Sequence, residues 1–397
     1  MALLHPLHPN SIYVLAQAGN LDIARFGGKP NTDIAKAIMS ALTQACASTT
    51  PSKIVIPAGS YQMSAVDFRG PCKAPIELQV DGKVNAPENA AELKGLEYWF
   101  KLRHINSFTL SGKGTFDGEG PSAWKQNDCT KNKDCKMLCM NFAFHFMNDS
   151  MFRDITSKDS KNFHVNVLGC NNITFDKFTI SAPDESPNTD GIHIGKSTGV
   201  KILNCNIGTG DDCISLGDGC KNTTVQNVTC GPGHGISVGS LGRYENEEPV
   251  EGLFVKNCTL KNTNNGVRIK TWPTDKLGPE TVTDMHFEDI IMINVSNPII
   301  VDQEYCPWNQ CSKKVPSKTK ISKVSFKNIQ GTSGTKEGLV LICSSGVPCE
   351  DVQINNVDLT FKGAETAANC SNVKPITVGK APNHCQKIST INFVLEM

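Results

Sequence analysis

Three scarcities narrow the possible functions of this 397-residue chain. Aromatic residues make up only 7% of it. The 39 basic and 39 acidic residues cancel, so no net charge draws the chain to nucleic acid or to an anionic membrane surface. No run of 18 apolar residues occurs, so we expect no membrane-spanning helix. We therefore expect neither a nucleic acid nor a membrane as partner, and a charged ligand would have to be attracted by local groups.

Cysteine, by contrast, is abundant. The chain has 17 cysteines without a CxxC…CxxC zinc pattern, which favours an oxidising compartment and disulfide bonds, and the odd number leaves at least one thiol free. Seven N-x-S/T sequons agree with a secretory route and with a glycoprotein, without indicating which of them carry a glycan; they are Asn148, Asn172, Asn222, Asn227, Asn257, Asn294 and Asn369. Residues 1–20 lack a basic segment, and proline interrupts their short apolar run, so we interpret them as an atypical leader or a disordered segment.

A repeated strand pattern dominates the chain from residue 151 onwards. The repeats alternate apolar and polar residues, as half-buried strands do, and start 21 to 39 residues apart. They are MFRDITSKD (151–159), NITFDKFTI (172–180), VKILNCNIG (200–208), TTVQNVTCG (223–231), LFVKNCTLK (253–261), MHFEDIIMI (285–293), VSFKNIQGT (324–332) and VQINNVDLT (352–360). Steps of this size are typical of the coils of a right-handed parallel β-helix.

A second series of strands aligns between these repeats. DGIHIG (190–195), DCISLG (212–217) and HGISVG (234–239) align without gaps, and NGVRIK (265–270) and NPIIVD (297–302) follow with one insertion. This register predicts two core columns, which are Ile192, Ile214, Ile236, Val267 and Ile299, and Ile194, Leu216, Val238, Ile269 and Val301. His193, Ser215, Ser237 and Arg268 then face outwards beside a column of Gly195, Gly217 and Gly239. A flat, polar, glycine-lined outer face could hold a long ligand, although the glycines could equally serve only turns.

The predicted fold is all-β, with an N-terminal helix that covers the open end of the solenoid. Residues 33–46 (DIAKAIMSALTQAC) place Ile34, Ile38 and Leu42 on one helix face. No linker rich in proline, glycine or serine separates this part from the repeats. We therefore expect residues 21–397 to form a single catalytic domain.

The stretch GTGDDCISLG (208–217) places two carboxylates side by side. In the predicted register Asp190, Asp212 and His234 occupy the same position on three successive coils, which lie roughly 4.8 Å apart. Unpaired charges are costly inside the core, so we expect these side chains in the turns before the strands. Asp211 adds a third carboxylate, and the sequence predicts all four groups together on one exposed edge.

Clustered carboxylates of this kind suit the hydrolysis of glycosidic bonds. One carboxyl must donate a proton to the leaving oxygen, and crowding raises the pKa of one member of such a cluster. Asp190 and Asp212 would hold the attacking water, Asp211 would be the acid, and His234 would tune its proton. Arg268 and Lys270 lie on one face of the next strand and would bind a carboxylate on the sugar. Calcium could also occupy an acidic cluster, but these cations and His234 already compensate its charge, so we expect no metal.

Taken together, NTDGIHI (188–194), GDDCISLG (210–217), GHGISVGSLG (233–242) and RIK (268–270) resemble the four signature segments of polygalacturonases, the glycoside hydrolases of pectin. The resemblance extends over nearly the whole chain from LDIARFGGKPNTD (21–33) and is greatest to plant pollen-type enzymes. It implies a right-handed parallel β-helix and inverting hydrolysis of α-1,4-linked galacturonic acid, without metal or cofactor. The resemblance further implies that the protein is a monomer and is secreted to the plant cell wall.

The resemblance also implies roles for individual residues. Asp211 would be the general acid, Asp190 and Asp212 would activate water, and His234 would assist. The implied substrate-binding residues are Asn188, His193, Arg268, Lys270 and Tyr305, the last within DQEYCP (302–307). The implied disulfide pairs are Cys213 with Cys230, Cys343 with Cys349, and Cys370 with Cys385.

Several alternatives stay open at this level. An inactive wall protein would bind pectin without cleaving it, and a pectate lyase would need calcium and an arginine base. Rhamnogalacturonan or xylogalacturonan hydrolysis is less compatible with Arg268 and Lys270. We expect exo action from the pollen-type resemblance, with endo action as the alternative.

Overall fold

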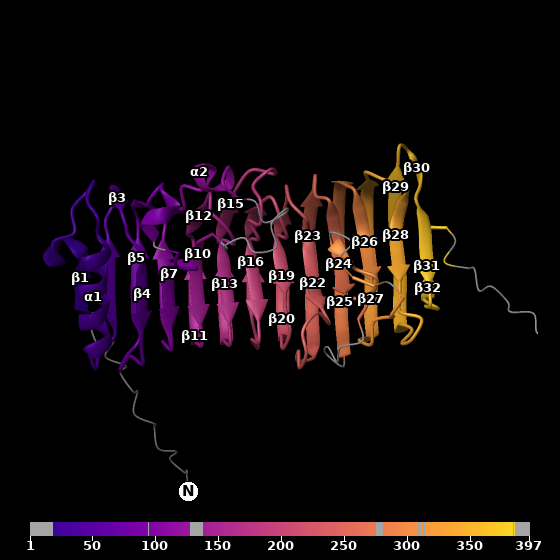
Figure 1. The fold of residues 1–397 in the computed structure, drawn as a ribbon, viewed down its shortest axis with the longest axis horizontal. Helices are drawn as coiled ribbons and strands as arrows, with labels where there is room; N and C mark the ends of the chain where they lie inside the picture. Colours follow the sequence, from indigo (N-terminus) through magenta and orange to yellow (C-terminus); the bar gives the residue numbers. More distant parts are fainter. Residues whose placement is uncertain are drawn as a thin grey trace, which may run out of the picture.

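The computed structural model describes residues 19–93, 95–127, 138–274, 281–307, 311–312, 314–383 and 385. These residues form parallel strands stacked coil upon coil into one elongated solenoid, which Figure 1 shows with its long axis horizontal. The fold is the predicted right-handed parallel β-helix. Of the predicted leader, residues 1–18 lie outside the described residues, and Gly19 and Asn20 pair with Ser52 and Lys53 in the first coils.

One side of the solenoid is an 11-stranded parallel sheet, here called the site sheet. Its strands in order are β4 (Val66–Arg69), β7 (Tyr98–Arg103), β10 (Met140–His145), β13 (Val165–Leu168), β16 (Ile192–Gly195), β19 (Ile214–Leu216), β22 (Ile236–Leu241), β24 (Asn265–Thr271), β26 (Asn297–Asp302), β28 (Glu337–Ile342) and β31 (Ala367–Ser371).

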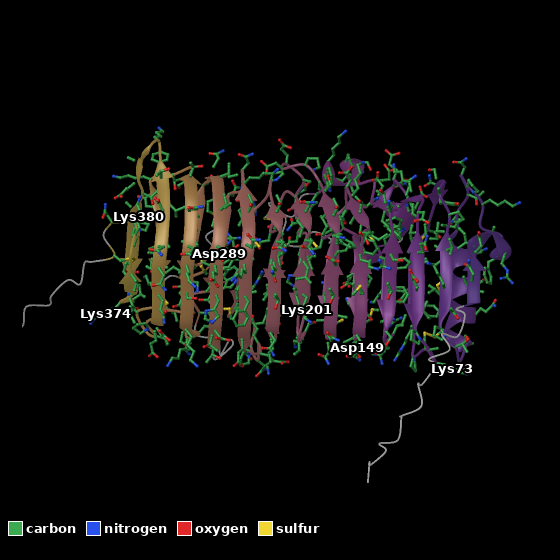
Figure 2. All side chains as sticks on the ribbon, turned by 180° about the vertical axis from the view of Figure 1, so that it is seen from behind. Lys73, Asp149, Lys201, Asp289, Lys374 and Lys380 are labelled. Carbon is green, nitrogen blue, oxygen red and sulfur yellow. A yellow bond between two sulfur atoms is a disulfide. The ribbon has the colours of Figure 1, made fainter. Side chains whose placement is uncertain are left out.

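The other sides belong to a 21-stranded sheet, which begins as two ladders that merge in the later coils. The first ladder contains β1 (Gly19–Asp22), β2 (Ser52–Ile56), β5 (Ile76–Val80), β8 (Phe108–Gly112), β11 (Asn148–Arg153), β14 (Asn171–Asp176), β17 (Lys201–Leu203) and β20 (Lys221–Gln226). The second contains β3 (Ser60–Gln62), β6 (Lys83–Asn85), β9 (Thr115–Asp117), β12 (Thr156–Lys158), β15 (Thr179–Ser181), β18 (Asn206–Gly208) and β21 (Thr229–Cys230). The joined strands are β23 (Val250–Lys261), β25 (Thr281–Val295), β27 (Lys320–Ser333) and β29 (Glu350–Phe361), followed by β30 (Ala364–Glu365) and β32 (Ile376–Val378). Seen from behind in Figure 2, charged side chains such as Lys201 on β17 and Asp289 on β25 lie on the outer surface of this sheet.

The strand register confirms both predicted core columns. Ile192, Ile214, Ile236, Val267 and Ile299 pair in succession across the site sheet, and so do Ile194, Leu216, Val238, Ile269 and Val301. All ten are at most 1% exposed. Because side chains alternate across a strand, the residues between these columns point outwards. The register therefore also aligns His193, Ser215, Ser237 and Arg268 on the outer face.

The few aromatic residues are concentrated inside the earlier coils. Phe144 and Phe152 stack with ring centroids 3.8 Å apart, and Phe152 stacks on Phe175 at 4.9 Å. Phe142 and Phe116 meet edge to face at 4.8 Å. Large rings fill the wide interior between the sheets, where each buries a large apolar area.

The predicted helix covers the first coil, as Figure 1 shows. It runs over α1 (Ala35–Ala47), and its buried face is Ile38, Ala41, Leu42 and Ala45, with Ile34 buried at its N-terminus. Other short helices within the described residues are η1 (Ile23–Phe26), η2 (Ala90–Leu93) and α2 (Pro121–Trp124). Among the described residues, no helix has the length and apolar character that a membrane span requires.

Asparagine and aspartate mark the bend between the two ladders. Asn204, Asn227, Asn257, Asn328 and Asn356 all have φ between +52° and +56°, the left-handed region in which asparagine is favoured among residues with side chains. Their amides stack along the solenoid, with Asn257 donating to Asn227 at 2.7 Å and Asn328 donating to Asp289 at 3.0 Å. The predicted sequons at Asn227 and Asn257 therefore lie in a structural asparagine ladder. Their glycosylation stays a prediction.

Five disulfides lie within the described residues. Cys213 bonds Cys230, Cys343 bonds Cys349, and Cys370 bonds Cys385, which are the three expected pairs. Cys46–Cys72 and Cys306–Cys311 were not predicted. Cys139, Cys170, Cys205, Cys220 and Cys258 are free and buried.

Candidate active site

Asp190 and Asp212 lie in turns, as predicted, two residues before β16 and β19. The adjacent coils are stitched together there, since the amide of Gly191 donates to the carbonyl of Asp212 at 2.8 Å. The prediction of an exposed edge is wrong for these two residues, which are only 6% and 3% exposed. Neighbouring side chains from the next coils cover them, and this burial determines their electrostatics.

The turn that presents Asp211 is built by small residues. A methyl group on Gly210 would overlap the carbonyl oxygen of Ser186, so only glycine fits there. The Gly210 amide donates to Thr189 Oγ1 at 2.9 Å, and Thr209 Oγ1 donates to the Asp211 carbonyl at 2.9 Å. The glycine of GTGDD thus lets the turn pack tightly enough to hold the carboxylates in place.

Asp212 is surrounded by donors. Its Oδ1 accepts hydrogen bonds from Ser237 Oγ and Arg268 Nη2, and its Oδ2 accepts one from Lys270 Nζ, all at 2.8 Å. Burial alone would raise the pKa of Asp212, but the Lys270 and Arg268 charges and these hydrogen bonds hold it below its usual range. Asp212 is therefore ionised, and neither of its oxygens is free of a charged donor.

Asp190 has the opposite environment. Burial, reinforced by the negative charges of Asp211 and Asp212, raises its pKa well above the ordinary value. Ser215 Oγ donates to Asp190 Oδ2 at 3.1 Å, and His193 Nδ1 lies 2.8 Å from that serine oxygen. Burial lowers the pKa of His193 to about 4, so this ring is neutral. Since the serine has a single proton to donate to Asp190, His193 holds its own proton on Nδ1 and donates it to Ser215.

Asp211 and His234 form a hydrogen-bonded pair at the surface of the site. His234 Nδ1 lies 3.0 Å from Asp211 Oδ1, which also accepts the Asp212 amide at 2.8 Å. The hydrogen bond with Asp211 raises the pKa of His234 above its ordinary value despite partial burial. Asp211 and His234 are 26% and 33% exposed at their side chains, so this pair faces solvent. Asp211 Oδ2 receives no hydrogen bond from the described residues and remains available to a ligand.

The predicted binding residues divide into two groups. Arg268 and Lys270 do point to the outer face, but each is already paired with Asp212. Tyr305 lies beside them, with its ring centroid 5.4 Å from Lys270 Nζ. Asn188 is exposed in the turn before Asp190, with φ of +54°. His193 contacts Ser215, so its contact within the site is to the Asp190 network.

Asp211, Asp212 and His234 could also be considered as a cation site. Their possible ligand atoms all lie within 4.8 Å of one another. Both Asp212 oxygens are occupied by cationic donors, however, which leaves only Asp211 and His234 for an ion. Hard cations such as calcium require six or more oxygen ligands, which these two side chains do not supply.

Comparison with known proteins identifies the family of this arrangement. The profile described as Glycosyl hydrolases family 28 matches residues 46–385. The chain belongs to glycosyl hydrolase family 28.

Plant members of family 28 are similar to the chain over most of its length. A polygalacturonase of Medicago sativa is 64% identical over 375 residues, covering 93% of this chain and 89% of the relative. An exopolygalacturonase of Oenothera organensis is 54% identical over 351 residues, covering 88% and 96%.

Solved structures of low sequence identity share the fold. An endo-xylogalacturonan hydrolase from Aspergillus tubingensis superposes with a TM-score of 0.79 at 22% identity, covering 91% of this chain and all of that one. A hyperthermoactive exopolygalacturonase from Thermotoga maritima superposes with a TM-score of 0.71 at 16% identity, covering 92% and 93%. At these identities the likeness shows the fold alone.

Two serines of this family 28 site received no role from the sequence. Ser215 orients Asp190, and Ser237 donates to Asp212 while accepting from Arg268 Nε at 3.2 Å. The register had placed both on the outer face, in the column next to the carboxylates. That column was the signal that could have revealed them, because outward serines beside buried carboxylates are natural hydrogen-bond donors.

Proposed function

We propose that the chain hydrolyses α-1,4-glycosidic bonds of polygalacturonate by a single attack of water. The observation that carries this proposal is the division of three neighbouring carboxylates into an ionised Asp212, a proton-binding Asp190 and an Asp211 coupled to His234. Glycoside hydrolysis needs both a proton donor and a proton acceptor at one bond. Membership of family 28 and similarity to plant polygalacturonases support the same reaction class.

The Asp211–His234 pair supplies the proton in this mechanism. The hydrogen bond with Asp211 raises the pKa of His234, so His234 keeps a proton beside Asp211 until the pH rises through that pKa. Asp211 Oδ2 receives no hydrogen bond from the described residues, so in the protonated pair this oxygen would carry the proton that passes to the leaving oxygen as the glycosidic C–O bond breaks. His234 then re-establishes the protonation of the pair from solvent.

Asp190 and Asp212 hold the attacking water from adjacent coils. Asp190, once ionised, accepts a proton from water as the new C–O bond forms, and Asp212 orients that water through its fixed negative charge. Asp212 is a poor covalent nucleophile because Arg268 and Lys270 occupy its oxygens. Direct attack by water is therefore favoured over a glycosyl–enzyme intermediate.

Arg268 and Lys270 have donors left for the substrate. Arginine has five N–H groups and lysine three. Asp212 accepts from one of each, and Ser237 accepts from a second N–H group of Arg268. The remaining donors would bind the carboxylate of a galacturonate residue at the site. Asn188 and Tyr305 would contact the same residue, and His193 would act through Ser215.

Reducing-end release from de-esterified polygalacturonate tests this proposal. We expect the wild type to release reducing ends without ultraviolet-absorbing unsaturated products, and an Asp211→Asn variant to be at least about 100-fold slower. Unsaturated products would indicate a lyase, and binding of pectin without cleavage would indicate an inactive wall protein.

Exo action is the finer proposal, supported by the Oenothera organensis exopolygalacturonase. Monogalacturonate as the first product would support it, whereas a ladder of oligomers with a rapid fall in viscosity would indicate endo action. Secretion to the plant cell wall is proposed as well, supported by the five disulfides. We further propose a monomeric enzyme with no cofactor and no metal.

A further inference from the structure

A row of cationic and aromatic side chains leads away from the catalytic carboxylates. It consists of Lys270, Tyr305, Trp272, Arg243 and Tyr244 and is here called the Arg243 row. Lys270 lies 5.4 Å from the Tyr305 ring, and Tyr305 meets Trp272 edge to face at 5.8 Å. The Arg243 Cζ atom lies 5.2 Å from the centroid of the Trp272 ring and 5.4 Å from the centroid of the Tyr244 ring. The row starts at Lys270, which binds Asp212, so it is continuous with the active site.

The backbone fixes the position of Arg243. It lies two residues after the end of β22, the strand that also carries Ser237. Glu247 clamps the following loop, because its Oε2 accepts the Gly242 amide at 2.6 Å and its Oε1 accepts the Tyr244 amide at 2.8 Å. The Trp272 amide donates to the Leu241 carbonyl at 2.8 Å, which ties the ends of β22 and β24 together. Arg243 is therefore held in a fixed position relative to Lys270.

Arg243 contacts two aromatic rings but has no ion-pair partner among the described residues. Arg268 and Lys270 are each paired with Asp212, and Arg103 is paired with Asp67. Arg243 is exposed and has no carboxylate within ion-pair distance among the described residues, and the nearby Glu247 is engaged by two backbone amides. Stacking on aromatic faces leaves the N–H groups at the guanidinium edge free to donate. A planar, pre-oriented guanidinium of this kind suits a bidentate carboxylate.

We propose that Arg243 binds the carboxylate of a second galacturonate residue, the one adjoining the residue held by Arg268 and Lys270. This inference rests on the proposed function and deepens it, because it assigns a specificity-determining residue for galacturonate substrates longer than two sugar residues. Tyr244, which is 62% exposed, offers an aromatic face to the same sugar. The enzyme would then favour substrates with two consecutive unesterified residues on this side of the scissile bond.

The test compares di- and trigalacturonate as substrates of an Arg243→Gln variant. We expect the ratio of kcat/KM for trigalacturonate to that for digalacturonate to fall roughly tenfold or more, which is the effect of losing one charge-assisted hydrogen bond. Arg153→Gln on β11 of the other sheet is the matched control, since Arg153 pairs only with groups remote from the site sheet, and its ratio should equal that of the wild type. An unchanged ratio in Arg243→Gln, or an equal loss on both substrates, would overturn the proposal.

Methyl esterification of trigalacturonate provides the complementary change. An ester on the terminal residue that Arg243 holds should lower wild-type kcat/KM as much as the substitution does, and should add no further loss in Arg243→Gln. The two terminal residues are esterified separately. If the ester and the Arg243→Gln substitution gave additive losses of kcat/KM at whichever end carries the ester, the assignment would be contradicted.

Binding separates this inference from the proposed reaction. Calorimetry of trigalacturonate with Asp211→Asn, with and without Arg243→Gln, should show roughly tenfold weaker binding in the double variant. If the wild type cleaved nothing while this difference persisted, the proposed hydrolysis would fail and the carboxylate site would stand. Equal affinities would overturn the carboxylate site whatever the wild type cleaves.

Discussion

At the scale of single residues, the proposed mechanism depends on three similar carboxyl groups that experience three different environments. Lys270 and Arg268 keep Asp212 ionised, burial and like charge drive Asp190 towards its neutral form, and Asp211 is hydrogen-bonded to His234. Side chains from neighbouring coils create these differences. The assignment of acid and water-activating roles follows from them.

The first residue-scale prediction concerns His234. We expect His234→Ala to lower kcat roughly 100-fold and to move the alkaline limb of the pH profile to lower pH. The reason is the sign of the shift: a raised pKa means that His234 keeps the proton of the pair as the pH rises towards that value, and the proton is lost above it. The measurement is kcat/KM against pH for both enzymes.

A histidine–aspartate pair on the opposite sheet provides the control for this experiment. His286 lies 2.8 Å from Asp284 on β25, and His286→Ala should leave the profile unchanged. An alkaline limb that stayed in place in His234→Ala would refute the proposed supply of the proton by the Asp211–His234 pair.

The second residue-scale prediction concerns the stability cost of Asp190. A raised native pKa means that the folded chain binds more protons than the unfolded chain, so stability falls as the pH rises through that pKa. Asp190→Asn removes this cost, so we expect the melting temperature to rise by roughly 2 °C or more near neutral pH while activity is lost. The gain should vanish below about pH 4, where an ordinary carboxyl is protonated in the unfolded chain as well.

Calorimetric scans at neutral and acid pH measure this difference. Asp67→Asn, at an exposed carboxylate paired with Arg103, serves as the comparison and should show no such gain. A gain of equal size at both pH values would mean that the ionisation of Asp190 is not the cause.

At the scale of strands and turns, much of the arrangement follows from sequence periodicity. The columns beginning with Ile192 and Ile194 were predictable because the 22-residue step recurs without gaps from 190 to 234. The column of Ser215, Ser237 and Arg268 followed from the same register. The partners of Asp212 did not, because Lys270 reaches it from two coils away and side-chain reach is not visible in a strand alignment.

Among the disulfides, too, some could be predicted from the sequence and others could not. Cys213–Cys230 links adjacent coils of the recognised motifs, and the family resemblance implied it. Cys46–Cys72 joins the end of α1 to the segment after β4, in the irregular early coils where no repeat fixes the register. Its pairing could not be read from spacing because several cysteines were possible partners.

The element-scale prediction concerns the asparagine ladder at Asn328. This residue has φ of +52°, and its amide donates to Asp289 Oδ1 at 3.0 Å. We expect Asn328→Ala to lower the free energy of unfolding by about 2 kcal/mol, because a β-carbon is disfavoured in this region and the ladder hydrogen bonds to Asp289 and from Asn356 are lost.

Asn328→Gly separates these two contributions. Glycine adopts the left-handed region readily, so this variant should lose about 1 kcal/mol for the ladder hydrogen bonds alone. Denaturant unfolding of both variants gives the comparison. Glycine and alanine variants of equal stability would show that backbone conformation does not contribute.

At the scale of the whole molecule, the chain has no net charge, and the solenoid gathers the charged residues of the candidate active site on one face. The site sheet carries Asp190 and Asp212 just before β16 and β19, and Arg268 and Lys270 on β24, and the Arg243 row extends from Lys270. Sequence could predict this face and its carboxylates. It could not predict the Arg243 row, because the loop after β22 and the strand end at Trp272 approach each other only in the folded chain.

Stereochemistry is the point at which the whole account can be contradicted. Inverting enzymes usually separate their acid and base by roughly 6.5–9.5 Å. Asp211, the proposed acid, and Asp212, the residue proposed to orient the water, have oxygens within 4.8 Å, closer to the spacing of retaining enzymes. The account nevertheless predicts inversion, because the donors on both Asp212 oxygens leave water as the nucleophile.

The most direct measurement is therefore proton NMR of the anomeric signals during the first turnovers on de-esterified polygalacturonate. The account predicts that the β-anomer of the new reducing end appears first and then mutarotates. Initial formation of the α-anomer would show retention and would contradict direct attack by water held between Asp190 and Asp212.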